Sequence, residues 1–163
     1  MPKTILLQFE AEKAARLRRL EQTGTDSEEN IGRDFRRNIE RYLDQGHGAC
    51  HLGRPEVADL VVKALRHFEG RRYLLNDWVV MPNHVHAVVW PMPNWLLGEV
   101  LKSWKQYASR RAKPLVGLAE GRFWQTESYD HWIRNDDEQA RICRYIRHNP
   151  VTARLCARPE DWR

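Results

Sequence analysis

Two apolar stretches separated by one short turn constrain the fold of this chain more than any other feature. Residues 72–81 are rich in Tyr, Leu, Trp and Val, and residues 84–90 have a similar composition. Pro82 and Asn83, which both favour turns, lie between the two stretches. So short a connection joins antiparallel strands, because parallel strands need a long crossover. The sequence therefore predicts an antiparallel β-hairpin over residues 72–90.

Helical patterns lie on both sides of this hairpin. The expected helices cover residues 2–21, 33–43, 55–68, 95–112 and 135–149. Asn135 suits the N-cap of the last helix, and Pro150 is expected to stop it. Residues 122–134 alternate in part between apolar and polar side chains and predict a third strand or an extended segment. This order of elements predicts an α+β fold in which helices cover one face of an antiparallel sheet.

Size and composition exclude several classes of protein. A chain of 163 residues with 42% apolar residues suits a single domain, here with a helical and irregular N-terminal part over residues 1–54. Charged residues make up 30%, and no apolar stretch approaches the length of a membrane-spanning helix. Three cysteines are too few, and odd in number, for a disulfide scaffold, so a reducing, cytoplasmic setting is expected.

Positive charge gathers in two segments that contain no acidic residue. The chain carries 27 basic and 22 acidic residues, a formal net charge of +5. Residues 101–114 interleave basic and aromatic side chains, namely Lys102, Trp104, Lys105, Tyr107, Arg110 and Arg111, and residues 141–158 include Arg144 and Arg147. Cations for phosphates and flat rings for unstacked bases are what a single-stranded nucleic acid groove needs. The alternative is a pair of solvated helix faces with inward-facing aromatic rings.

Two histidines on the second predicted strand form a candidate metal site. His84 and His86 are separated by one residue, so on a strand both side chains project from one face. Two adjacent imidazoles supply half of a metal site. The alternative is a pair that is exposed to solvent or hydrogen-bonded within the protein.

The last predicted helix carries a candidate nucleophile. Tyr145 and Asn149 are four residues apart and share a helix face. Asn149 offers an amide oxygen, and the Tyr145 phenol can act as a nucleophile if a nearby cation lowers its pKa. The alternative is a core aromatic and a C-terminal cap. Tyr107 is a rival nucleophile, but Arg111 stands four residues after it, so a stacking or packing role is expected.

These motifs together resemble a known family. The pieces Met81-Pro-Asn-His84-Val-His86 and Tyr145-Ile-Arg-His-Asn149-Pro-Val, with the basic helix and Trp124–Arg134 between them, resemble the REP-associated tyrosine transposases, which are single-tyrosine HUH endonucleases. The resemblance covers about residues 55–155. It implies a ferredoxin-like fold, with His84, His86 and Asn149 as ligands of Mg²⁺ or Mn²⁺ and Tyr145 as the nucleophile.

The resemblance also implies a function. A chain of this family would cut and rejoin single-stranded DNA at hairpin-forming repeats through a 5′-phosphotyrosine, as a monomer or a homodimer. Two alternatives stay open: a non-catalytic relative that binds hairpin DNA, and a ferredoxin-like module that binds RNA. The family's usual first strand has no clear counterpart near the start of the chain, so a shortened copy or an alternative start is expected.

Overall fold

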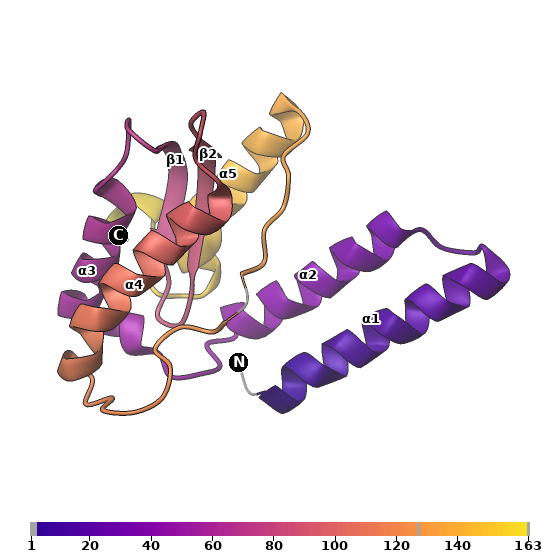
Figure 1. Cartoon of the computed structure of the whole chain (residues 1–163), viewed down its shortest axis with the longest axis horizontal. Helices are drawn as coiled ribbons and strands as arrows, with labels where there is room; N and C mark the ends of the chain where they lie inside the picture. Colours follow the sequence, from indigo (N-terminus) through magenta and orange to yellow (C-terminus); the bar gives the residue numbers. More distant parts are fainter. Residues whose placement is uncertain (1–2, 127, 163) are drawn as a thin grey trace. The chain divides into compact units, whose positions relative to one another are not determined.

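The computed structural model describes residues 3–126 and 128–162 and shows an α+β fold, which confirms the expected class (Figure 1). The chain divides into two compact units, Met1–Ala49 and Cys50–Arg163. The expectation of a single domain stays a prediction. Among the described residues, no helix combines the length and apolar character that crossing a bilayer requires.

The N-terminal unit is a pair of helices, α1 (Lys3–Thr23) and α2 (Glu28–Asp44). Arg16 on α1 joins them, because its guanidinium lies 2.9 Å from a carboxylate oxygen of Asp34 on α2. The Ser27 hydroxyl caps α2 by accepting the Asn30 N–H. This cap, with two acidic residues in the first turn, starts α2 five residues before the expected position.

The C-terminal unit contains the predicted hairpin. Strands β1 (Tyr73–Val80) and β2 (Val85–Pro91) pair antiparallel, and the turn is closed by the Met81 N–H, which donates to the His84 carbonyl at 2.9 Å. The pairing is irregular between Leu75 and Trp78, where β1 contains one residue more than β2. This bulge matters for the site below, because it changes which side chains β1 presents to each face.

Helices cover both faces of the hairpin, which corrects the expectation that they gather on one. Helices α3 (Pro55–Arg66) and α4 (Leu97–Leu115) pack on the face that carries Val80, while α5 (Asp136–Thr152) packs on the face that carries Val79 (Figure 1). The physical reason is visible in β1. Val79 and Val80 point to opposite faces, and both are buried, so each face of the hairpin needs an apolar cover.

Each face has its own apolar cluster. The α3–α4 core contains Leu52, Val57, Ala58, Val61, Leu65, Val80, Ala108 and Ala112. The α5 core contains Val79, Met81, Val88, Cys143 and Ile146. Short 3₁₀ helices, η1 (His51–Gly53) and η2 (Pro159–Asp161), flank the two cores. The second core is the one that brings helix α5 against the histidine strand.

Residues 122–134 form no strand in the part of this segment that the structure describes, which leaves the extended alternative; residue 127 lies outside the described residues. Side chains hold the segment instead of a β-ladder. Phe123 and Trp124 pack against the α3–α4 core, and the Lys105 ammonium donates to the Gln125 carbonyl at 3.0 Å. These contacts replace the backbone pairing that a third strand would have made.

Helix α5 continues through Pro150, although Pro150 was expected to stop it. A proline inside a helix removes one backbone donor, but its φ is compatible with the helix. The last turn is closed by the Ala153 N–H, which donates to the Asn149 carbonyl at 2.9 Å, and by the Leu155 N–H, which donates to the Pro150 carbonyl at 2.9 Å. Asn149 therefore lies within the helix rather than at its end. Helix α4 likewise includes Pro114, beyond its expected end.

Candidate metal and nucleophile site

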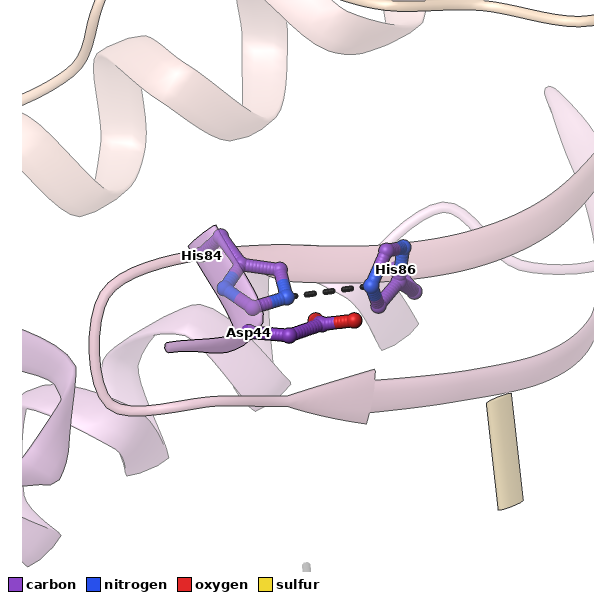
Figure 2. A group of neighbouring side chains, drawn as sticks. All are labelled: Asp44, His84 and His86. Atoms are coloured by element: carbon purple, nitrogen blue, oxygen red, sulfur yellow. Dashed lines mark hydrogen bonds between the residues drawn. The ribbon is translucent and has the colours of Figure 1, made fainter. Parts of the chain in front are cut away.

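The two histidines lie side by side on the face of the hairpin that α5 covers. His86 is paired across the strands with Val79, a member of the α5 core, so their side chains share a face. His84 stands just before β2, and its Nε2 lies 3.0 Å from His86 Nε2 (Figure 2). The His84 side chain is buried. Asp44, which Figure 2 also draws, belongs to the N-terminal unit.

Asn83 orients the first of these imidazoles. Its side-chain oxygen lies 2.7 Å from His84 Nδ1 and accepts a hydrogen bond when that nitrogen carries the proton. His84 Nε2 then keeps its lone pair for a ligand on the side of His86. Asn83 was expected only to form the turn. Its position directly before a candidate ligand is the signal that could have identified it.

Helix α5 brings both of its predicted residues to the histidines. The Tyr145 ring lies edge-on to the His86 ring, with 5.4 Å between centroids. The Asn149 amide nitrogen lies 3.4 Å from His86 Nε2, and the residue is buried, with an exposed fraction of 3%. Tyr145 is 38% exposed, so part of this residue is open to an external substrate. The four residues predicted for metal binding and nucleophilic attack therefore meet at one place.

The donor set fits a small divalent cation. Two ligand nitrogens at right angles, each about 2.1 Å from one ion, are about 3.0 Å apart. The His84 and His86 Nε2 atoms are separated by 3.0 Å, which matches the spacing of two neighbouring ligands of one octahedral ion. The Asn149 amide group lies beside them with its nitrogen toward His86, and it would offer its oxygen to an ion after a half-turn of the amide. Imidazole and amide oxygen together are compatible with Mn²⁺ or Mg²⁺.

A basic groove runs along α4. It is open, has a volume of about 420 Å³, and is lined by Arg72, Glu99, Lys102, Ser103, Gln106, Tyr107, Arg110 and Arg111. The Arg111 guanidinium lies 4.2 Å from the centre of the Tyr107 ring, and Arg72 lies between the rings of Phe68 and Trp95. Four of the predicted nucleic-acid residues therefore share one surface. Sequence reasoning missed Arg72, which comes from the segment before β1.

The other predicted nucleic-acid residues do not line this groove. The Trp104 indole N–H donates to the Tyr73 hydroxyl at 2.8 Å, which gives Trp104 a packing role. Lys105 binds the carbonyls of Gln125 and Thr126. Arg144 is exposed on α5, whereas Arg147 is engaged by Asp77 on β1. The groove and the site are also set apart, because α4 and α5 cover opposite faces of the hairpin.

Comparison with known proteins assigns the family. Residues 57–149 match the family model described as IS200-like transposase, and the chain, matched over more than half its length, belongs to this family. The REP-associated tyrosine transposase of Escherichia coli (strain K12) is 30% identical over 92 residues, which make up 56% of this chain and 53% of that protein. The chain thus spans about half the length of this relative. No solved structure matches the present chain.

Proposed function

We propose that this protein is a metal-dependent enzyme that cuts and rejoins single-stranded DNA, with hairpin-forming repeats as its substrates. The observation that carries the proposal is the convergence of a half-exposed tyrosine with two imidazoles. Tyr145 and His86 come from elements far apart in the sequence, yet their rings lie 5.4 Å apart between centroids. Membership of the IS200-like transposase family and similarity to a REP-associated transposase support the same conclusion.

Each residue of the site has a defined part in this reaction. Bound Mg²⁺ or Mn²⁺ would neutralise charge on the scissile phosphate and on the leaving 3′ oxygen. His84, His86 and Asn149 would hold that ion, and Asn83 keeps His84 in the tautomer that can donate its Nε2 lone pair. The Tyr145 hydroxyl would face the phosphate from α5, the helix that also supplies Asn149.

The covalent step balances without a further reactant. The Tyr145 oxygen loses its proton and forms a bond to phosphorus, while the bond from phosphorus to the 3′ oxygen breaks. The products are a 5′-phosphotyrosine and a strand that ends in a 3′-hydroxyl, which takes up a proton. A second 3′-hydroxyl can reverse the step and join a new strand. Because one phosphodiester bond is replaced by another, the exchange needs no nucleotide hydrolysis.

The α4 groove is the proposed contact with the DNA backbone. Arg72, Lys102 and Arg110 supply cations for phosphates, and Tyr107 supplies a ring on which a base can stack. Trp104 and Lys105 are left out of this contact because each has a partner within the protein.

A covalent-adduct assay tests the proposal. Labelled single-stranded DNA that contains a genomic hairpin repeat is incubated with the full chain and Mn²⁺ and separated on a denaturing gel. The unsubstituted protein is expected to form a labelled adduct, whereas Tyr145→Phe forms none. Tyr42→Phe, which alters a tyrosine stacked on His47 in the N-terminal unit, is the control and retains the adduct.

The same assay separates the alternatives. DNA binding without an adduct, unchanged by Tyr145→Phe, would identify a non-catalytic hairpin binder. Preference for RNA of the same sequence, with no need for a metal ion, would identify an RNA-binding module. Either result would overturn the proposed activity.

A further inference from the structure

An ion pair joins the nucleophile helix to the strand beside the histidines. Arg147 lies between Tyr145 and Asn149 in the sequence of α5, and its guanidinium donates two hydrogen bonds to the Asp77 carboxylate of β1. Nε lies 2.5 Å from Oδ1, and Nη2 lies 2.9 Å from Oδ2. Two parallel bonds of this kind fix both distance and orientation. The pair therefore connects residues seventy positions apart that belong to different elements of the site.

The bulge in β1 brings a second side chain to this interface. Regular alternation would place Asn76 and Asp77 on opposite faces, but the extra residue between Leu75 and Trp78 breaks the alternation. Both side chains contact α5: Asp77 binds Arg147, and the Asn76 amide lies 3.9 Å from Cys143 Sγ. The Asp77 side chain is only 14% exposed, whereas that of Arg147 is 62% exposed. The Asp77 carboxylate thus lies within the interface between α5 and the hairpin, whereas the Arg147 side chain lies at its edge.

The other hydrogen bonds between α5 and the hairpin are longer, with 3.4 Å between Asn149 and His86 and 3.9 Å between Asn76 and Cys143, and the remaining contacts are apolar. Cys143 and Ile146 pack on Val79 and Val88 through apolar surface, and such burial tolerates small rotations and shifts of a helix. An ion pair with two parallel hydrogen bonds tolerates such movements less well, because each bond depends on distance and angle. Arg147 is two residues from Tyr145 and two from Asn149, so a rotation of α5 that moves the phenol away from His86 also moves the Arg147 backbone relative to Asp77 and strains the two hydrogen bonds.

We propose that Asp77 is a positioning residue that acts through Arg147 to set where α5 lies on the hairpin, and thereby holds the Tyr145 hydroxyl in place beside the histidines. The proposal rests on the proposed function for its catalytic consequence, but not for its geometry. It also reassigns Arg147, which the sequence predicted as a DNA contact. Two of its donors are committed to Asp77.

A spectroscopic test needs neither DNA nor a metal ion. The Tyr145 ring shifts the proton NMR signals of the His86 ring, because the two rings lie edge-on in contact. In the full chain, Asp77→Asn should move the His86 signals toward their positions in Tyr145→Leu, which marks the absence of the ring. The reversed pair, Asp77→Arg with Arg147→Asp, should move them back. His86 signals that do not change in Asp77→Asn would overturn the proposal.

The matched control is a second arginine–aspartate pair with two hydrogen bonds, which does not connect different helices or strands. Arg158 binds Asp161 with both Nε and Nη2, but these residues are three positions apart in one short segment. Asp161→Asn should leave the His86 signals unchanged. A shift of equal size in Asp161→Asn would mean that the signals report general loosening, which would also overturn the proposal.

Adduct formation then measures the catalytic consequence. Asp77→Asn should slow the adduct about 10- to 100-fold, since a displacement of about 1 Å near a reacting group has effects of this size, and the reversed pair should recover part of the rate. If Arg147 instead contacts DNA, Asp77→Asn frees it and the adduct forms at least as fast, which contradicts the proposal. If the unsubstituted chain forms no adduct, the proposed function fails, and the NMR result still decides the positioning.

Discussion

At the scale of single residues, Tyr73 shows how a buried hydroxyl supports the fold. Its side chain is 1% exposed, and its hydroxyl donates to the Leu65 carbonyl at 2.7 Å while accepting the Trp104 indole N–H at 2.8 Å. One atom thus connects β1, α3 and α4. This arrangement also explains why Trp104, although placed among basic residues, is directed inward.

Tyr73→Phe should therefore destabilise the protein while leaving its shape intact. The ring stays, but the partly buried Trp104 N–H loses its acceptor and the Leu65 carbonyl loses its donor, which costs roughly 1–3 kcal/mol. Urea unfolding followed by fluorescence measures the change. Tyr107→Phe is the matched control, because Tyr107 lies in the open groove, where water can take the place of a lost partner. Equal stability of Tyr73→Phe and the unsubstituted protein would refute this role.

Asn83 gives a second prediction at this scale. Asn83→Ala should weaken Mn²⁺ binding about 10- to 100-fold, because partners that orient a metal-binding histidine have effects of this size. Asn83→Asp should retain the affinity, since a carboxylate oxygen can accept the same hydrogen bond from His84 Nδ1. Titration calorimetry on the full chain compares the three proteins. Equal affinity in all three would show that the turn residue does not orient the imidazole.

At the scale of elements, the sequence predicted what depends on local chemistry. The hairpin follows from a two-residue turn between apolar strands, and the start of α5 follows from Asn135, whose side chain accepts the Glu138 N–H. The shared face of Tyr145 and Asn149 follows from helix geometry alone. These expectations needed no knowledge of the rest of the chain.

Other features depend on contacts between distant segments, and these could not be predicted. Helix α5 passes through Pro150 because the following residues close its last turn, and residues 122–126 are held by side chains on α4 and its core. The partner of Arg147 is Asp77 of β1, seventy positions away in the sequence. Which strand residue meets which helix residue depends on how the two elements pack, so Asp77 was not identified as part of the site.

The Asp77–Arg147 pair gives a prediction of pH dependence. The hydrogen bonds from Arg147 lower the pKa of the Asp77 carboxyl below its ordinary value. A lowered folded-state pKa contributes stability that is fully present above the unfolded pKa, about 3.9, and is lost as the pH falls through the folded pKa. Cys143, the other titratable neighbour, stays protonated in this range, because burial raises its pKa to about 11.

The unsubstituted protein should accordingly be more stable than Asp77→Asn at pH 7, and this advantage should shrink below about pH 4. Urea unfolding of both proteins at pH 7 and pH 3 measures the difference. Asp161→Asn controls for the general effect of acid on exposed carboxylates. An advantage that persists undiminished at pH 3 would show that the charge of Asp77 does not stabilise α5 on the hairpin.

At the scale of the whole molecule, the two proposed DNA contacts lie on different helices with the hairpin between them. The basic groove belongs to α4, and the nucleophile belongs to α5, which covers the other face. A DNA element bound in the groove must therefore extend past the hairpin to reach Tyr145. Binding through phosphates and cleavage at the tyrosine should then be separable by substitution.

The salt dependence of DNA binding tests this separation. A protein cation that neutralises a phosphate releases counterions, so the logarithm of the binding constant falls as the logarithm of the salt concentration rises. On single strands, each lost phosphate contact makes this slope shallower by about 0.7. Lys102→Ala and Arg110→Ala should each make the slope shallower by about that amount and weaken binding similarly for all DNA sequences. Tyr145→Phe should abolish the adduct and leave the slope unchanged. Fluorescence anisotropy at several KCl concentrations measures binding and its slope.

The control is Lys63→Ala, which removes an exposed cation of α3 outside the groove and should leave the slope as it is. If Lys63→Ala changes the slope as much as Lys102→Ala, DNA binding reflects overall charge, and the groove has no special part in it.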